Sequence, residues 1–194
     1  MILRFVFLSA ALAAGILLGA NAAVAADWDI DQLMQTLAQV RSSHTTFSEK
    51  RTLALLDKPQ VSSGELIYKA PDYFEKRTLQ PKAETLILNG DTVLIARGQK
   101  HYLLKLADYP EIAAFTASLR GTLAGDRQML QRSYLLSLDG SKAHWKLQFL
   151  PTDSRIKDRI ARILIRGADN ELRSIEIIQT DGDSSITTIA SPAP

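Results

Sequence analysis

Three histidines are the residues of this chain best suited to acid–base or metal chemistry: His44, His101 and His144. None of them stands at a known metal-ligand spacing from a second histidine or a carboxylate. His144 lies on the polar side of an alternating stretch, which indicates a solvated side chain. The sequence has no cysteine, which excludes thiolate chemistry and cysteine-containing metal sites. We therefore expect neither a metal nor a cofactor.

Nucleophilic catalysis would need a serine, a histidine and a carboxylate to meet in one pocket. The sequence contains no G-x-S-x-G motif, and its glycines form no phosphate-binding loop. A lipid-directed esterase would require residues such as Ser133, Asp139 and His144 to converge. We expect no enzyme, and the esterase is the least favoured alternative.

Length and composition suit one folded domain. The 194 residues are 46% hydrophobic and 23% charged, which suits a single sizeable core and argues against disorder. The formal net charge is only +2, and no dense basic run marks a nucleic-acid surface. The mixed-charge stretch 153–162 is typical of a solvated edge strand, although its cations could also meet anionic lipid or an acidic partner.

The first residues predict export. Arg4 precedes an apolar run that ends at Leu18, and small residues follow. This is the layout of a secretory signal peptide covering residues 1–26, with cleavage near Ala25 or Ala26. An uncleaved anchor is the alternative, but the apolar run is short for a membrane span. The absence of cysteine also leaves no residue that could carry the lipid of a bacterial lipoprotein.

Apolar periodicity predicts one helix followed by many short strands. Residues 29–41 carry an apolar stripe at helical spacing, and Asp27 or Asp29 can cap the helix. Short strands separated by turn signals follow. The strongest hairpin signal is Asn89-Gly90-Asp91. The expected strands are 44–56, 64–70, 72–80, the two arms of 84–97, and 100–106.

Residues 108–130 break the strand pattern and are predicted to be helical. Asp108 can cap this segment, and a second short helix can begin after Asp126. Strands resume with a hairpin around Asp139-Gly140 and continue with three strands between residues 159 and 190. The total is roughly ten strands with one leading helix and one helical insertion.

Several predicted strands are apolar on both faces, among them "TLILNG", "TVLIAR", "HYLLKL" and "ARILI". An antiparallel sheet with one face in water should alternate instead. One interpretation is a sheet curled around an apolar interior that residues 108–130 close. A sandwich or a filled small barrel explains the same pattern without any ligand.

The order of these elements resembles the periplasmic outer-membrane lipoprotein carrier family, LolA. The matching features are Phe47, Gly64 to Tyr68, Ala70-Pro71, Tyr73-Phe74, Asn89-Gly90-Asp91, and the later stretches "FLPTD" and "IIQTDGDSS". The resemblance covers most of the chain after the signal peptide. The family typically has arginine before this proline, where Ala70 stands here, so we expect a divergent member.

The resemblance implies a mainly β (α+β) fold. In it, a curled antiparallel sheet forms an incomplete barrel, with an N-terminal helix and a helical lid insertion. It also implies a single carrier domain over residues 27–194, in the periplasm and without enzyme activity. Such a carrier shields the acyl chains of lipoproteins or of another envelope lipid on the way to the outer membrane.

The resemblance implies partners as well. We expect a monomer whose cargo is a lipid or an acylated protein, delivered by an inner-membrane transporter or exporter and passed to an outer-membrane acceptor. We expect no nucleic acid. A periplasmic scaffold or adaptor of an envelope export system, without lipid binding, is the main alternative.

The expected cavity residues come from the predicted inward faces of the strands. They are Leu66, Tyr68, Phe74, Leu86, Leu88, Trp145, Leu147 and Phe149. The expected lid residues are Ile112, Phe115 and Leu119. Because the strand parity is inferred, each of them could equally be an ordinary core residue.

Overall fold

The computed structural model describes residues 28–191, except for the side chains of Pro110, Glu111 and Phe115. The signal-peptide prediction therefore lies outside the described residues. The first element is helix α1 (Ile30–Leu37). The Asp29 carboxylate caps it by accepting a hydrogen bond from the Gln32 backbone N–H at 2.8 Å, as one of the two predicted caps.

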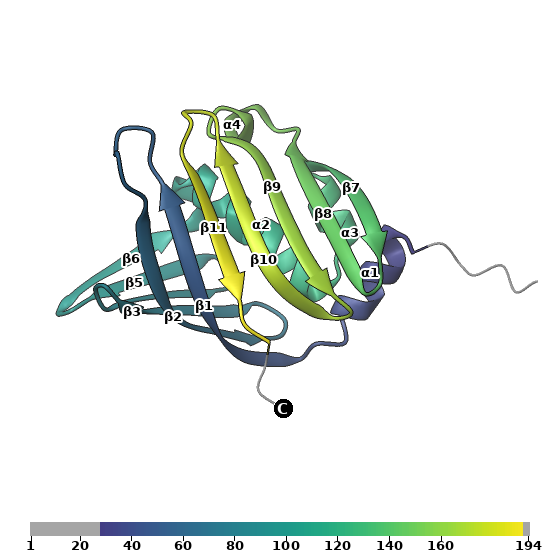
Figure 1. Ribbon diagram of the computed structural model, residues 1–194, viewed down its shortest axis with the longest axis horizontal. Helices are drawn as coiled ribbons and strands as arrows, with labels where there is room; N and C mark the ends of the chain where they lie inside the picture. Colours follow the sequence, from purple (N-terminus) through teal and green to yellow (C-terminus); the bar gives the residue numbers. More distant parts are fainter. Residues whose placement is uncertain (1–27, 192–194) are drawn as a thin grey trace, which may run out of the picture.

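Eleven antiparallel strands form one sheet in the described part of the chain (Figure 1). They are β1 (Ser42–Thr52), β2 (Gln60–Lys69), β3 (Tyr73–Gln80), β4 (Glu84–Asn89), β5 (Thr92–Arg97), β6 (Lys100–Lys105), β7 (Tyr134–Ser141), β8 (His144–Pro151), β9 (Ile160–Ala168), β10 (Glu171–Gln179) and β11 (Ser184–Ile189). Their order in space is β6-β5-β4-β3-β2-β1-β11-β10-β9-β8-β7. The sheet is not closed, and this confirms the predicted curled, mainly β architecture.

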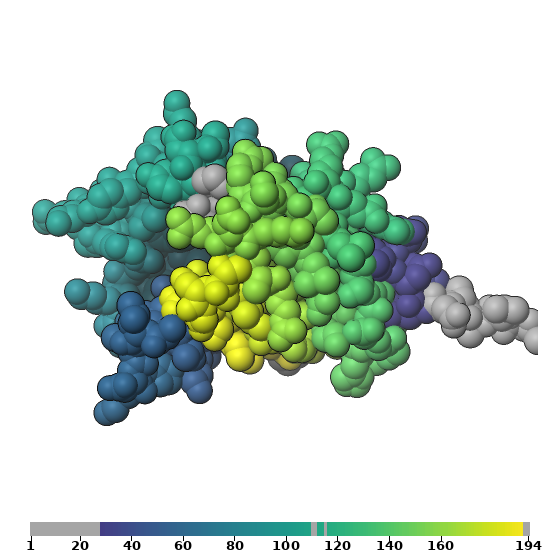
Figure 2. Space-filling model, turned by 90° about the horizontal axis from the view of Figure 1, so that it is seen from above, coloured from purple at the N-terminus to yellow at the C-terminus, as the bar shows by residue number. Residues whose placement is uncertain are grey.

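The pairing of β1 with β11 joins the two halves of the sheet. Phe47 lies opposite Ile189, and Thr52 lies opposite Ser184. We call strands β3 to β6 the wing. Figure 2 shows, from above, the blue β1–β2 hairpin and the teal wing on one side and the green strands β7 to β9 on the other. The first and last strands of the sequence therefore lie side by side in the middle of the sheet.

Four further helical segments follow the wing or interrupt the second half. They are η1 (Leu106–Asp108), α2 (Pro110–Ala124), α3 (Arg127–Gln131) and α4 (Ser154–Lys157). Helices α1, α2 and α3 lie against one face of the curled sheet (Figure 1). No helix in residues 28–191 is long and apolar enough to span a membrane.

The predicted helical insertion differs from the structure in its first turn. Asp108 belongs to η1, and Tyr109 is the N-cap of α2, without a side-chain cap bond. Helix α2 then continues through Gly121. A Cβ at this position would lie only 2.5 Å from Cδ2 of Leu130 on α3. The glycine allows the two helices to pack closely. Helix α3 begins after Asp126, which caps it as predicted.

The prediction of a turn at Asp139-Gly140 is wrong. Both residues lie inside β7, with Asp139 opposite Lys146 and Gly140 opposite Trp145, and the turn is at residues 142–143. Gly140 has φ of +98°, and a Cβ on it would meet the His144 carbonyl oxygen at 2.1 Å. Glycine is therefore required because the backbones of β7 and β8 lie too close for a side chain at this position, and it does not mark the turn.

The mixed-charge stretch 153–162 is not an edge strand. It contains helix α4, whose start is capped by Asp153, and it then leads into β9, an interior strand. Arg155 folds back on the Asp153 carboxylate at 2.9 Å. The Asp153 cap explains why a charged segment forms a helical turn at this position. The two edges of the sheet are β6 and β7.

Candidate functional site

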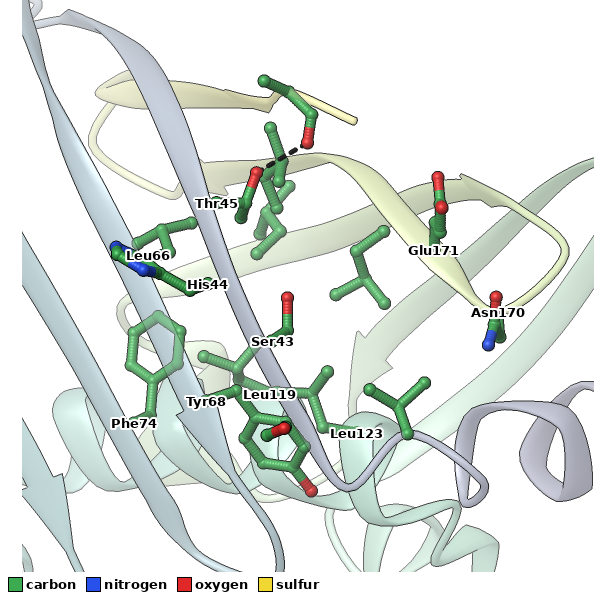
Figure 3. Close-up of a pocket in the computed structure, with 16 residues that line it drawn as sticks. Ser43, His44, Thr45, Leu66, Tyr68, Phe74, Leu119, Leu123, Asn170 and Glu171 are labelled. Carbon is green, nitrogen blue, oxygen red and sulfur yellow. Dashed lines mark hydrogen bonds between the residues drawn. The ribbon is translucent and has the colours of Figure 1, made fainter. Parts of the chain in front are cut away.

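A cavity of about 330 Å³ lies inside the curl of the sheet, close to the β1–β11 junction (Figure 3). Its walls are mostly apolar. The side chains come from β2, β3, α2, β10 and β11 and include Leu66, Tyr68, Phe74, Leu119, Leu123, Leu172, Ile175 and Ile189. The volume is at the lower end of the range of small-molecule pockets, about 300–1,000 Å³.

The rim of the cavity is polar. It includes Ser43, His44 and Thr45 at the start of β1, Asn170 in the β9–β10 turn and Glu171 at the start of β10. The Thr45 hydroxyl donates a hydrogen bond to the Ala190 carbonyl at 2.7 Å, and Figure 3 shows this bond at the edge of the cavity. An apolar interior with a polar rim suits a ligand that has an apolar tail.

Helix α2 closes the cavity from the inner side. Its residues Leu119 and Leu123 line the wall. The Tyr134 hydroxyl donates to the Ala114 carbonyl at 2.8 Å and ties α2 to β7, and burial raises the pKa of the Tyr134 phenol. The Arg120 guanidinium donates to the Gly90 carbonyl in the β4–β5 turn. Helix α2 is therefore held at both sides of the sheet.

Four of the predicted contact residues line the cavity: Leu66, Tyr68, Phe74 and Leu119. Ile112 instead packs against the wing cluster, which consists of Leu88, Val93 and Leu106. Phe115 belongs to α2, but its side chain is outside the described residues. Leu88 is a member of the wing cluster, and Leu86 packs against it.

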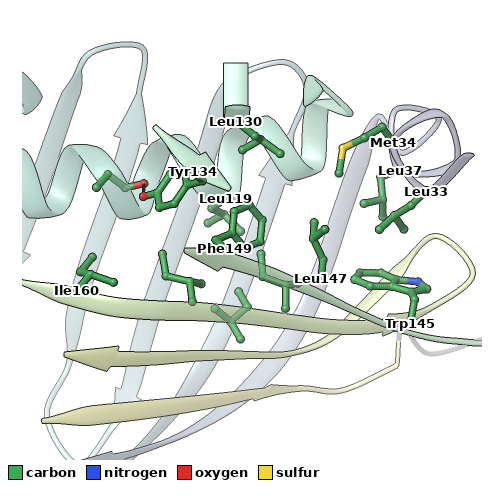
Figure 4. Packing of buried hydrophobic residues seen from close by; sticks show 14 of the residues in the cluster. Leu33, Met34, Leu37, Leu119, Leu130, Tyr134, Trp145, Leu147, Phe149 and Ile160 are labelled. Atoms are coloured by element: carbon green, nitrogen blue, oxygen red, sulfur yellow. Dashed lines mark hydrogen bonds between the residues drawn. The ribbon is translucent and has the colours of Figure 1, made fainter. Parts of the chain in front are cut away.

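The other predicted cavity residues belong to a filled core. Trp145, Leu147 and Phe149 are at most 2% exposed, and they pack against α1, α2 and α3 in a single cluster (Figure 4). The Phe149 ring meets the Tyr134 ring edge to face, with centroids 5.6 Å apart. These residues share the inward face of the sheet with the cavity but do not line it. The inner face is thus packed over β7–β9 and hollow near β1 and β2.

Several lining residues were not predicted from the sequence. Val40 and Ser43 lie just before and within the first strand, while Leu123 is one helical turn beyond Leu119. The helical spacing from Leu119 could have identified Leu123. Ile189 and Ile175 could have been found only from the pairing of β11 with β1 and of β10 with β11, which no local signal specifies.

The candidate chemical residues do not converge. Ser133 precedes β7, whereas His144 begins β8 opposite Ser141, so the two lie roughly 25 Å apart along the hairpin. Asp139 pairs with Lys146 at 2.8 Å. His44 on the rim lies 3.5 Å from Glu65. Within residues 28–191, no group of three or more histidine, aspartate or glutamate side chains could hold a metal ion.

A polar groove of about 940 Å³ occupies the other end of the inner face, beyond Phe47. The Lys76 ammonium lies 4.8 Å from the centre of the Phe47 ring and 2.7 Å from the Glu49 carboxylate. Burial raises the pKa of Glu49, but its interactions with Lys76, Arg51 and Ser62 outweigh this and leave the pKa below its ordinary value. Glu49 is therefore ionised at neutral pH, and the groove contrasts with the apolar cavity.

Solved structures with detectable similarity share little sequence with this chain. A LolA superfamily protein from Nitrosomonas europaea is 8% identical, with a TM-score of 0.43 and coverage of 84% of this chain and 92% of that one. A DUF1329 family protein from Desulfovibrio piger is 10% identical, with a TM-score of 0.49 and coverage of 84% and 89%. In the MucA/MucB complex from Pseudomonas aeruginosa, the matched chain is 14% identical, with a TM-score of 0.47 and coverage of 86% and 59%.

A search of curated proteins returned no match. A family model gave a clear result. The model described as "Outer membrane lipoprotein carrier protein LolA-like" matches residues 22–194, which is most of the chain. This agrees with the resemblance inferred from the order of the strands and turns. The chain therefore belongs to the LolA-like family of outer membrane lipoprotein carrier proteins.

Proposed function

We propose that this protein is a periplasmic carrier that holds the acyl chains of a lipoprotein or of another envelope lipid in the apolar cavity. The observation that carries the proposal is the cavity itself, an apolar space between α2 and the inner face of the sheet, bordered by a polar rim. Membership of the LolA-like family supports the same reading.

The physical need for such a cavity is simple. Keeping an acyl chain in water costs about 0.8 kcal/mol for each CH₂ group, so an unshielded lipid does not cross an aqueous compartment at a useful rate. A wall of leucine, isoleucine and aromatic side chains removes this cost. The polar rim leaves the head group, or the protein attached to the lipid, in water.

The carrier would act between two membranes. The layout of residues 1–26 supports export by a cleaved signal peptide. The cargo would come from an inner-membrane transporter or exporter and pass to an outer-membrane acceptor, with the carrier acting as a monomer and without catalysis. Ala70 stands where the family typically has arginine, so Arg120 is the better candidate for holding the lid shut.

Filling the cavity tests the proposal. Ser43 lines the cavity and Ser48, on the same strand, is exposed. We expect Ser43→Trp to weaken the binding of a dansyl-labelled fatty acid at least tenfold, or about 1.4 kcal/mol, because the indole takes the place of the ligand. Ser48→Trp should bind the probe like the natural protein. Fluorescence titration measures both, and thermal unfolding verifies that both variants are folded.

Native mass spectrometry of the protein purified from periplasm without detergent would identify the cargo. An adduct of lipid mass is the expected result, and its fragments give the cargo class. If neither a lipid adduct nor probe binding is observed, the carrier function is refuted, and the scaffold or adaptor becomes the preferred function. Equal probe binding by Ser43→Trp and the natural protein would mean that the probe binds elsewhere.

A further inference from the structure

The loop between β1 and β2 exposes leucine side chains that no part of the described chain covers. Leu55 is 96% exposed and Leu56 is 47% exposed. Val61, at the start of β2, is 60% exposed, and Leu79, near the end of β3, is 54% exposed. Residues 51 and 60 pair in register, as do residues 63 and 80, so all four apolar side chains lie at the same end of the sheet. We call residues 53–59, between β1 and β2, the leucine loop.

The leucine loop has a defined conformation. A turn is closed by the hydrogen bond from the Leu56 backbone N–H to the Leu53 carbonyl at 3.0 Å. The Ala54 backbone N–H donates to the Asp183 carboxylate at 2.8 Å, which ties the loop to the β10–β11 turn. The loop projects from the molecule beside the last strand (Figures 1 and 2). The leucines are therefore presented to solvent by a braced turn.

Cations slightly outnumber carboxylates around these leucines. Residues 50 to 61 contain Lys50, Arg51 and Lys58 against Asp57, and the neighbouring β10–β11 turn adds Asp181 and Asp183. Lys82, in the β3–β4 turn, lines the polar groove together with Arg51. None of these four cations makes a salt bridge with another described residue. Exposed apolar side chains beside lysines that form no salt bridge are an arrangement that binds an anionic lipid surface.

We propose that the leucine loop docks the protein on a bilayer that contains anionic lipids. Leu55 and Leu56 enter the boundary between head groups and acyl chains, while Lys50, Lys58 and Lys82 contact the phosphate groups. This goes beyond the proposed function, since it concerns a surface at the opposite end of β1 from the cavity rim. It does not require that the cavity binds lipid.

Flotation with vesicles tests the docking surface. The probes are vesicles of phosphatidylglycerol with phosphatidylethanolamine, compared with vesicles of phosphatidylcholine. We expect the full chain to bind the anionic vesicles at least tenfold more tightly, with binding that falls as salt rises. The double variant Leu55→Asp/Leu56→Asp should lose at least tenfold in affinity. Leu135→Asp, at a leucine 64% exposed on β7, is the matched control and should bind normally.

A second pair of variants tests the charges. Lys58→Glu should weaken binding several-fold, whereas Lys142→Glu, in the exposed β7–β8 turn, should not. Every variant keeps the same N-terminal residues. Equal binding by Leu55→Asp/Leu56→Asp and the natural protein would overturn the proposal, as would equal binding to both kinds of vesicle. A change in oligomeric state on gel filtration, without a change in vesicle binding, would identify the loop as a self-association surface instead.

The outcome is separate from that of the carrier proposal. Binding of the dansyl-labelled fatty acid in solution, without vesicles, reports on the cavity alone. Leucine-loop variants that bind the fatty acid but not vesicles support docking and leave the carrier function intact. A natural protein that binds anionic vesicles but no fatty acid refutes the carrier function and leaves docking intact.

Discussion

Glu75 illustrates how one residue is stabilised on the outer face of the wing. It is only 5% exposed, and its carboxylate accepts a hydrogen bond from the Tyr73 hydroxyl at 2.6 Å and another from the Arg77 guanidinium. Burial raises the pKa of Glu75. The two hydrogen bonds and the charge of Arg77 lower it by more, so the pKa lies below its ordinary value. The hydrogen bond to the Glu75 carboxylate, together with burial and the negative charge of that carboxylate, raises the pKa of Tyr73.

We predict that Glu75→Gln lowers the free energy of unfolding at pH 7 by about 1–3 kcal/mol, because two hydrogen bonds lose their charged acceptor. The folded-state pKa of Glu75 is below the unfolded value of about 4.3. The ionised group therefore stabilises the fold above that pH and loses this effect as pH falls through the folded-state pKa. Urea unfolding at pH 7 and in acid should show that the difference between variant and natural protein narrows in acid.

The exposed pair of Asp139 with Lys146 provides the control. Asp139→Asn should change the free energy of unfolding by less than about 1 kcal/mol at both pH values, as expected for a surface ion pair. A Glu75→Gln effect that is no larger, or that grows in acid, would contradict the role assigned to Glu75.

Residue-level prediction from the sequence worked where alternation was strong. The alternation of Trp145, Leu147 and Phe149 predicted one buried face, and β8 has that face. The prediction failed at Gly140. An Asp-Gly pair usually marks a turn, but this glycine is needed because the His144 carbonyl of the partner strand lies too close for a Cβ. That contact belongs to the partner strand, so residues 139–140 alone could not reveal it.

At the scale of elements, α2 is the candidate lid. Its contact with the wing includes Ile112 in the wing cluster and the Arg120 hydrogen bond to the Gly90 carbonyl. Arg120 reaches from the helix to a strand turn, whereas Ala70 offers no such group from the sheet. A hydrogen bond therefore connects the candidate lid to the sheet, and its donor belongs to α2.

We predict that Arg120→Met increases the dissociation rate of a bound dansyl-labelled fatty acid several-fold, because the lid loses its polar tie to the β4–β5 turn. The equilibrium stability of the sheet should change little, since methionine keeps much of the apolar stem in place. Stopped-flow displacement measures the rate. Arg132→Met, at the exposed C-cap of α3, is the control, and equal rates for the two variants would contradict a lid role for Arg120.

Element existence was largely predictable, because period-2 runs between turn residues identify strands without tertiary information. The exceptions have physical causes. Helix α4 depends on the Asp153 cap, whereas the charge pattern suggested a strand. The division of the inner face into a packed part and a hollow part depends on where α1, α2 and α3 rest, and their packing is non-local.

At the scale of the whole molecule, the two halves of the sheet are stabilised unequally. The main cluster contains fifteen buried residues from α1–α4 and β7–β10, whereas the wing cluster has only three, Leu88, Val93 and Leu106. Phe74 packs against both clusters and also lines the cavity. A movement of the wing would therefore move one wall of the cavity, while the packed half stays in place.

This asymmetry predicts how the sheet opens. Local opening is easiest where few apolar contacts must be broken, so amides of β4–β6 should exchange with solvent at least tenfold faster than those of β8 and β9. Hydrogen-exchange mass spectrometry can compare residues 84–105 with residues 144–168.

Two core variants test the same asymmetry. Leu88→Ala should accelerate exchange mainly in the wing. Leu147→Ala, in the main cluster, should accelerate it throughout and cost about 2–5 kcal/mol of stability. Uniform exchange across both regions would mean that the sheet opens as one unit, and access to the cavity would then require a movement of α2 alone.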